Sequence, residues 1–98
     1  MTPRVVFRPE ARAEVREARE WYEAHSPGLG LEFARAVEAV VATISRTPAF
    51  YPAVEGATRR ALLRRFPYQI IYEATAEAIV VIACFHHRRD PQVWRMRR

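Results

Sequence analysis

The sequence has no lysine, one cysteine and no long apolar run. A single cysteine, Cys84, cannot form an internal disulfide or supply a cysteine-based zinc site. No apolar segment approaches the roughly 20 residues that a helix needs to cross a bilayer. The first residues become charged before an apolar stretch forms, unlike the start of a secretory signal peptide. We therefore expect a soluble, cytoplasmic protein that does not enter a membrane.

The residues that are present fit one compact domain. The chain has 98 residues, of which 50% are hydrophobic and 28% are charged. This composition is too apolar for an intrinsically disordered chain. No repeat, low-complexity tract or linker divides the sequence, so we expect residues 1–98 to form a single domain.

Positive charge is concentrated in the second half of the chain. The sequence has 16 arginines against 11 acidic residues, a formal net charge of +5. Residues 1–58 hold seven arginines and eight glutamates, which gives −1. Residues 59–98 hold nine arginines and three acidic residues, which gives +6. A codon preference for arginine would explain the missing lysine but not this distribution, which predicts a surface for a nucleic acid or an acidic protein.

The first half predicts a short strand and two antiparallel helices. Residues 5–7 form a β-type run, and residues 10–25 carry apolar side chains at helical spacing. The Pro-Gly-Leu-Gly segment at residues 27–30 breaks this helix. It lacks the third glycine and the lysine of a phosphate-binding loop, so we interpret it as a turn between helices. A second apolar stripe begins at Phe33 and ends before Pro48.

The second half predicts three strands. Residues 48–56 form a connection, residues 58–66 an arginine-rich strand, and residues 68–73 and 78–85 the next two strands. Both faces of the last strand are apolar, so each face must be buried against another part of the structure. The helices cover one face, and the C-terminal tail or another protein must cover the other. The predicted fold is α+β, in the order β-α-α-β-β-β, with a helix hairpin packed on a small, mainly antiparallel sheet.

Several short strings are spread over nearly the whole chain. In order they are Pro9-Glu10-Ala11, Trp21-Tyr22, Pro27-Gly28-Leu29-Gly30, Phe50-Tyr51-Pro52, Phe66-Pro67-Tyr68-Gln69-Ile70-Ile71-Tyr72-Glu73, and His86-His87-Arg88-Arg89-Asp90-Pro91 with Trp94. In these strings and in the order of its elements, the chain resembles the RelE/ParE superfamily of bacterial toxins from type II toxin–antitoxin modules.

One branch of this superfamily consists of ribosome-dependent messenger-RNA endonucleases. Cleavage by the 2′-hydroxyl needs a proton acceptor, a proton donor and cations on the phosphate. Membership of this branch would imply a catalytic set of Arg60, His86, His87 and Arg88. Gln69, however, stands where the branch has a basic residue, and arginine accepts protons poorly because its pKa is very high. For His86 and His87, an exposed position at the end of a strand without any catalytic role is an equally good interpretation.

The other branch, the ParE-like toxins, poisons DNA gyrase by binding and tolerates the loss of the RNase residues. The resemblance therefore implies a gyrase inhibitor with roles in growth inhibition and plasmid stabilisation. An RNase that acts on the ribosome and mRNA is the first alternative, and a non-toxic binding module that keeps the fold is the second. The candidate target-contact residues are Arg59, Arg60, Arg64, Arg88, Arg89 and Trp94.

The resemblance also implies a cognate antitoxin as partner, in a heterotetramer or a larger toxin–antitoxin complex. We expect no cofactor. We expect no metal site either, because His86 and His87 are adjacent on a strand and point to opposite faces. Cys84 lies inside an apolar run, where a thiol is typically unreactive.

The C-terminal residues predict a turn back towards the sheet. Asp90 and Pro91 favour a turn or a short helix, which would return Trp94 to the sheet. Arg97 and Arg98 lie beyond this turn, and we expect both to be frayed.

Overall fold

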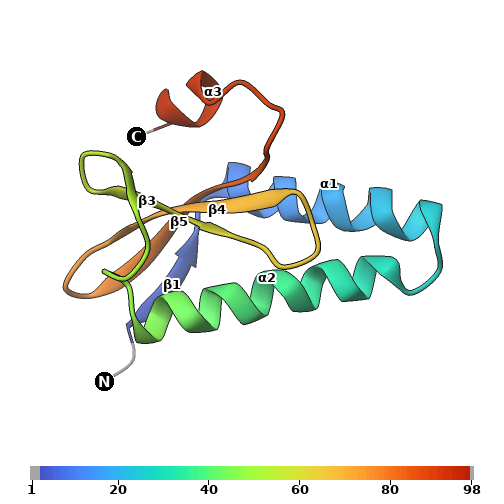
Figure 1. Cartoon of the computed structure of the whole chain (residues 1–98), viewed down its shortest axis with the longest axis horizontal. Helices are drawn as coiled ribbons and strands as arrows, with labels where there is room; N and C mark the ends of the chain where they lie inside the picture. The colour runs from blue at the N-terminus through green and yellow to red at the C-terminus, as the bar shows by residue number, and fades with distance from the viewer. Residues whose placement is uncertain (1–2, 98) are drawn as a thin grey trace.

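The structure, a computed structural model, describes residues 3–97 and has two helices packed against one face of a five-stranded sheet (Figure 1). The elements along the chain are β1 (Arg4–Phe7), α1 (Pro9–His25), α2 (Leu29–Arg46), β2 (Ala53–Glu55), β3 (Thr58–Leu62), β4 (Tyr68–Ala74), β5 (Ala78–His86) and α3 (Gln92–Arg95). Within residues 3–97, no helix is both long enough and apolar enough to span a membrane.

The sheet is mixed, with the strand order β1-β5-β4-β3-β2. β1 runs parallel to β5, and the other neighbouring strands pair antiparallel. Ile71 pairs with Ala83 and Tyr72 with Val81, so Ile82 is the extra residue of a β-bulge. The predicted α+β fold, a helix hairpin on a mainly antiparallel sheet, is confirmed.

Two predictions about strands are wrong in extent. The segment at residues 48–56, expected to be a connection, contains the short edge strand β2, which pairs with β3. The arginine-rich strand, predicted over residues 58–66, ends at Leu62. Its end is followed by Arg65, whose backbone is left-handed with φ of 72° and turns the chain towards β4.

The turn between α1 and α2 requires its glycines. Gly28 has a φ of 89°, in the left-handed region that favours glycine. A Cβ at Gly30 would lie 2.7 Å from the carbonyl oxygen of Arg19, so a side chain there would push the helices apart. The carboxylate of Glu23 accepts hydrogen bonds from the N–H groups of both glycines. The interpretation of this segment as a turn between helices is confirmed.

The core between the helices and the sheet is rich in aromatic side chains. Phe33 of α2 is fully buried, and its ring centroid lies 5.3 Å from those of both Tyr22 and Phe66. The hydroxyl of Tyr72 donates a 2.7 Å hydrogen bond to the carbonyl oxygen of Pro48 and fastens the end of α2 to the sheet. The sheet face that carries the helices is therefore fully covered.

The C-terminal segment covers part of the opposite face of the sheet, and α3 lies across the strands from α2 (Figure 1). Trp94 is only 3% exposed and packs in one cluster with Ile71, Ile82 and Phe85. The predicted return of Trp94 to the sheet is confirmed. The second apolar face of β5 thus meets the tail of its own chain.

Candidate functional site

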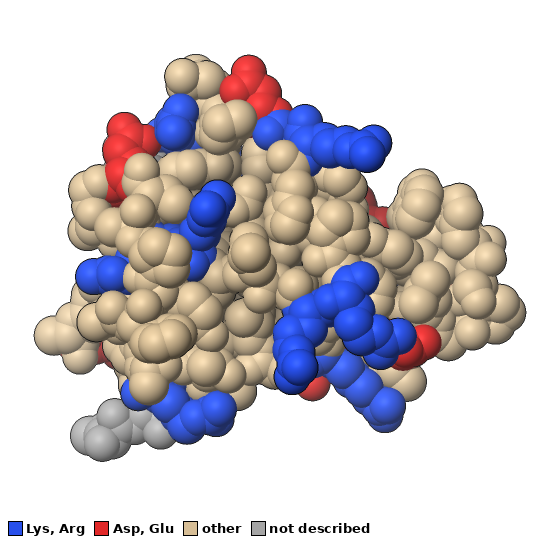
Figure 2. Space-filling model, viewed as in Figure 1, with Lys and Arg blue, Asp and Glu red and all other residues tan. Residues whose placement is uncertain are grey.

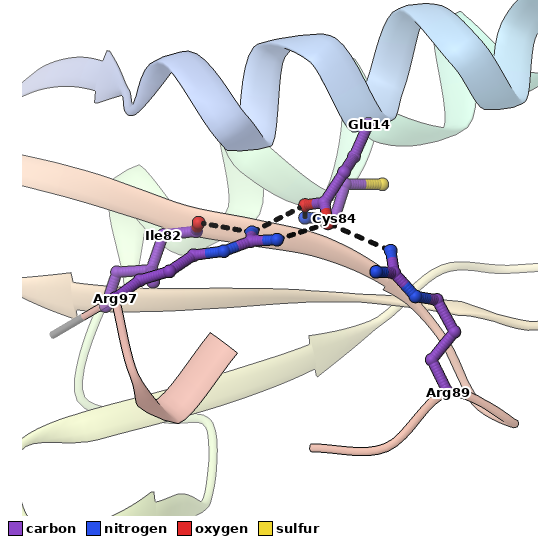
Figure 3. A network of polar contacts seen from close by, with 5 residues as sticks. All are labelled: Glu14, Ile82, Cys84, Arg89 and Arg97. Atoms are coloured by element: carbon purple, nitrogen blue, oxygen red, sulfur yellow. Dashed lines mark hydrogen bonds and ion pairs between the residues drawn. The ribbon is translucent and has the colours of Figure 1, made fainter. Parts of the chain in front are cut away.

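One carboxylate, that of Glu14 in α1, holds the C-terminal segment in place (Figure 3). Arg97 donates two hydrogen bonds to it, at 2.9 and 2.8 Å. Arg89 donates a third at 3.0 Å, and the backbone N–H of Cys84 donates a fourth at 3.1 Å. The side chains of Glu14 and Arg97 are only 10% and 14% exposed, so solvent screens this ion pair weakly.

The prediction that Arg97 is frayed is therefore wrong. Its guanidinium also donates to the carbonyl oxygen of Ile82, and its own carbonyl oxygen accepts a hydrogen bond from Arg8. The hydrogen bonds to Glu14 raise the pKa of Arg97, so its charge is fixed. Arg98 lies outside the described residues.

A small hollow lies on the sheet between α3 and strands β2 to β4. Its volume is about 230 Å³, and we call it the α3 hollow; its lining residues are Val54, Arg60, Gln69, Ile71, His87, Arg89, Pro91, Trp94 and Arg95. It brings Arg60 together with three predicted site residues of the C-terminal segment, His87, Arg89 and Trp94. Arg95 adds a further guanidinium, with Nε 3.1 Å from a carboxylate oxygen of Glu55.

Polar groups in the α3 hollow have unused hydrogen-bonding capacity. The side-chain oxygen of Gln69 is buried and accepts no hydrogen bond from any described residue. Arg60 is exposed, and its side chain forms no ion pair or hydrogen bond within residues 3–97. The guanidinium of Arg60 can donate hydrogen bonds to an anionic group of a partner molecule, and the oxygen of Gln69 can accept one from a donor of that partner.

His86 is separated from this hollow although it is the neighbour of His87. It lines a different cleft of about 480 Å³ between α1 and the ends of β4 and β5, together with Tyr22 and Tyr68. The His86 ring centroid lies 5.1 Å from that of Tyr68, and its Nδ1 accepts a hydrogen bond from the N–H of Arg88. The two histidines therefore line different clefts, and Arg89 lines both.

The other predicted contact residues are dispersed. Arg59 donates a 2.6 Å hydrogen bond to the carbonyl oxygen of Tyr51, so it ties the segment before β2 to β3. Arg64 lies in the turn after β3 and lines a groove beside α2. Arg88 is exposed directly after β5, and its guanidinium has no partner among the described residues. The six predicted contact residues thus do not form one continuous site.

Cys84 lies in the core, and its thiol is unreactive. Burial, with a smaller contribution from the charge of Glu14, raises the pKa of its thiol to about 12. The thiolate, which is the nucleophilic form, is therefore scarce at neutral pH. This agrees with the interpretation of Cys84 as a core residue.

Sequence reasoning missed Glu14 and Gln69. Glu14 lies three residues after Ala11 and four before Ala18, both of which are buried, so a lone carboxylate on the buried stripe of α1 was the available signal. Gln69 precedes three consecutive buried residues of β4, and no local pattern in the sequence shows that its oxygen becomes inaccessible.

The α3 hollow is better equipped for binding than for acid–base catalysis. Among the described residues that line it, His87 is the one imidazole, and none is a carboxylate. Arg60, Arg89 and Arg95 can neutralise a phosphate or a carboxylate but cannot accept a proton. The site therefore lacks an evident acid–base pair.

Comparisons with known proteins agree with this architecture. A family model described as the ParE toxin of the type II toxin–antitoxin system, parDE, matches residues 5–91. The fold is similar to that of a solved structure from the chromosomal ParDE system of P. aeruginosa, with a TM-score of 0.75, 15% identity, and coverage of 87% of this chain and 96% of that chain. It is also similar to the YoeB dimer from Staphylococcus aureus, with a TM-score of 0.54, 14% identity, and coverage of 89% and 99%. Curated proteins gave no match.

Proposed function

The chain belongs to the ParE toxin family of type II toxin–antitoxin systems, and we propose that it arrests growth by binding DNA gyrase unless a cognate antitoxin neutralises it. Gyrase acts on DNA in the cytoplasm, so the proposal places the toxin there. Its antitoxin complex is a heterotetramer or a larger assembly.

The residues that line the α3 hollow are the observation that favours binding over catalysis. Arg60, Arg89, Arg95 and His87 surround it, beside the exposed Arg88. Arg60 and Arg88, whose guanidiniums have no partner among the described residues, attract an anionic surface and speed association with it. A poison that acts by binding needs this surface and needs no general base. Gln69, which also lines the hollow, fits a binding role. Its amide can donate and accept hydrogen bonds but cannot act as a general acid or base.

One observation favours RNA cleavage as the second candidate. His87 and Arg60 line the same hollow, so an imidazole and a guanidinium can meet one phosphodiester. In a catalytic reading, His87 alone would have to exchange protons with the 2′-hydroxyl or the leaving oxygen. The predicted RNase set is only partly assembled, because His86 lies in the cleft beside Tyr68.

Controlled expression in a bacterial host separates these readings. Expression of the chain alone is expected to arrest growth and to induce the DNA-damage response, while total mRNA stays intact. Co-expression with the protein encoded by the adjacent reading frame is expected to restore growth. Rapid loss of intact mRNA before any DNA-damage response would instead establish the RNase reading. Normal growth at confirmed expression would identify a non-toxic binding module.

A further inference from the structure

The cleft that contains His86 differs in chemical character from the basic surfaces of the molecule. Its volume of about 480 Å³ lies within the usual size range of small-ligand sites in proteins. Four of its lining residues carry rings, and they come from α1 and from the ends of β4 and β5: Trp21, Tyr22, Tyr68 and His86. We call it the aromatic cleft.

The four rings of the aromatic cleft stand edge to face. The ring centroid of Tyr22 lies 5.1 Å from that of Trp21 and 6.2 Å from that of Tyr68, and the Tyr68 centroid lies 5.1 Å from that of His86. Neighbouring ring planes are inclined by 64° to 89°, so ring faces as well as ring edges border the cleft. Trp21 is 56% exposed, although tryptophan is a highly buried residue on average. The face of an aromatic ring carries partial negative charge and attracts a cation.

One carboxylate in the aromatic cleft is unpaired. Glu17 is exposed and forms no ion pair or hydrogen bond within residues 3–97. It lies one turn before Trp21 on α1, so both side chains occupy the same face of that helix. The other two charged residues of the cleft, Glu14 and Arg89, form an ion pair at 3.0 Å. Glu17 is therefore the charge that remains available to a ligand.

The lining charge of the aromatic cleft is opposite in sign to that of the α3 hollow. Two carboxylates and one arginine line the cleft and give −1, whereas three arginines and no carboxylate line the hollow and give +3. In Figure 2, the turn end of the helix hairpin, at the right, presents mainly uncharged residues, and arginine side chains lie over the rest of this face. Charge complementarity therefore favours a cation in the aromatic cleft.

We propose that the aromatic cleft binds an arginine side chain of a basic partner protein. A guanidinium is planar, stacks on aromatic faces, forms bidentate hydrogen bonds with a carboxylate, and is less strongly hydrated than the ammonium group of lysine. The cleft offers the rings of Trp21 and Tyr68 and the carboxylate of Glu17 for these contacts. This assignment goes beyond the proposed function and does not depend on it. Because a net charge of +5 repels basic proteins in general, the attraction must come from the cleft itself.

The binding probe is the peptide acetyl-Gly-Arg-Gly-amide, added to the full chain and followed by NMR through the indole N–H signals of the two tryptophans. Trp21 lines the cleft, whereas Trp94 is buried on the other face of the sheet and serves as an internal reference. The Trp21 signal should shift and saturate at millimolar peptide, and the Trp94 signal should stay in place. The same peptide with citrulline, which keeps the shape of arginine but not its charge, should bind at least about tenfold more weakly. The lysine peptide, which cannot stack, should bind about threefold more weakly.

Two identical substitutions on α1 test the carboxylate. Glu17→Gln removes a charge inside the cleft, whereas Glu20→Gln removes one at an exposed position outside it. Glu17→Gln should weaken binding of the arginine peptide about fivefold, since a charge-assisted contact is lost. Glu20→Gln should weaken it less than about twofold, because solvent screens a charge that does not touch the ligand. The dispersion of the NMR spectrum verifies that both variants are folded.

Three results would each overturn the proposal. Equal binding of the arginine and citrulline peptides would show that the cleft does not recognise a cation. Equal weakening by Glu17→Gln and Glu20→Gln would show that only long-range attraction is at work. A Trp21 signal that never moves would show that no ligand enters the cleft. All three leave the proposed function untouched, because neither toxicity nor the antitoxin enters the measurement.

Discussion

At the scale of single residues, Glu14 has the largest structural role of any charged side chain described above. We expect Glu14→Gln to lower the free energy of unfolding by about 2–4 kcal/mol, because it leaves two guanidiniums facing a neutral amide in a nearly buried site. Urea unfolding followed by circular dichroism measures the change. Glu20→Gln on the same helix is the control. Its contact with Arg16 is 4.0 Å long and exposed, so less than about 0.5 kcal/mol should be lost. Equal effects of the two substitutions would show that the Glu14 network adds no stability.

The two adjacent histidines provide a residue-scale test of catalysis against binding. If the toxin acts by binding, His87→Ala should reduce toxicity only partly, because it removes one of several contacts in the α3 hollow. Loss of an essential proton-transfer group would instead lower the rate by about 10²–10⁴ and abolish toxicity. His86→Ala is the matched control, since His86 lines a different cleft. The measurement is survival after induction at equal protein level. Complete loss of toxicity with His87→Ala alone, in a folded protein, would favour the RNase reading.

The partners of Glu14 lie beyond the reach of sequence reasoning. Its bond to Arg97 joins residues 83 positions apart, and its bond to Cys84 joins residues 70 positions apart. Helical spacing shows which face of α1 is buried, but it does not identify the segment that comes to lie against that face. The expectation that Arg97 is frayed was wrong for this reason. No partner for Arg97 lies near it in the sequence, and Glu14, which does bind it, is 83 positions away.

At the scale of elements, α3 depends on Trp94. We expect Trp94→Ala to lower the free energy of unfolding by about 3–5 kcal/mol, because it leaves a cavity against Ile71 and Phe85. Toxicity should fall as well, since Trp94 forms a wall of the α3 hollow. Val93→Ala, at an exposed position of the same helix, should cost less than about 1 kcal/mol. Chemical unfolding of both variants tests this. A Trp94→Ala protein of unchanged stability would show that α3 contributes nothing to the sheet.

The long elements and the short strand β1 were predictable from the sequence, whereas β2 and the end of β3 were not. Apolar spacing defined both helices, and β-branched runs defined β4 and β5 to within a residue or two. β2 has three residues and pairs with β3, and so short a segment shows no periodicity in the sequence. The end of β3 depends on a left-handed arginine, Arg65, a conformation that the identity of the residue does not predict.

The candidate site was predictable only in part for the same reason. Arg60, His87, Arg89 and Trp94 were identified by residue type, yet their convergence depends on the order of strands and on the return of α3. Arg59 belongs to the same basic cluster in the sequence, but strand alternation turns it towards Tyr51. Composition therefore identifies the kinds of residue at the site, while topology selects which of them meet.

At the scale of the whole molecule, the basic half of the chain contributes to two separate surfaces. The α3 hollow carries arginines, and so does a groove of about 540 Å³ beside α2, which is lined by Arg35, Arg64 and Arg65. The two surfaces share no lining residue. This separation allows one surface to be changed while the other is kept. Under the proposed function, the net charge of +5 favours association with an anionic target.

Reversal of charge at and beside the α3 hollow tests whether this surface contacts the target. In Arg60→Glu with Arg88→Glu, two exposed cations without partners in residues 3–97 become anions, a change of −4 in net charge, so stability should shift by less than about 1 kcal/mol. We expect toxicity to be lost and antitoxin affinity to stay within about tenfold, because only long-range attraction changes. Arg12→Glu with Arg19→Glu on α1 makes the same change in net charge away from both surfaces and should remain toxic. Growth curves and calorimetry with the antitoxin measure the two properties. A doubly reversed protein that remains fully toxic would show that the target does not contact this surface.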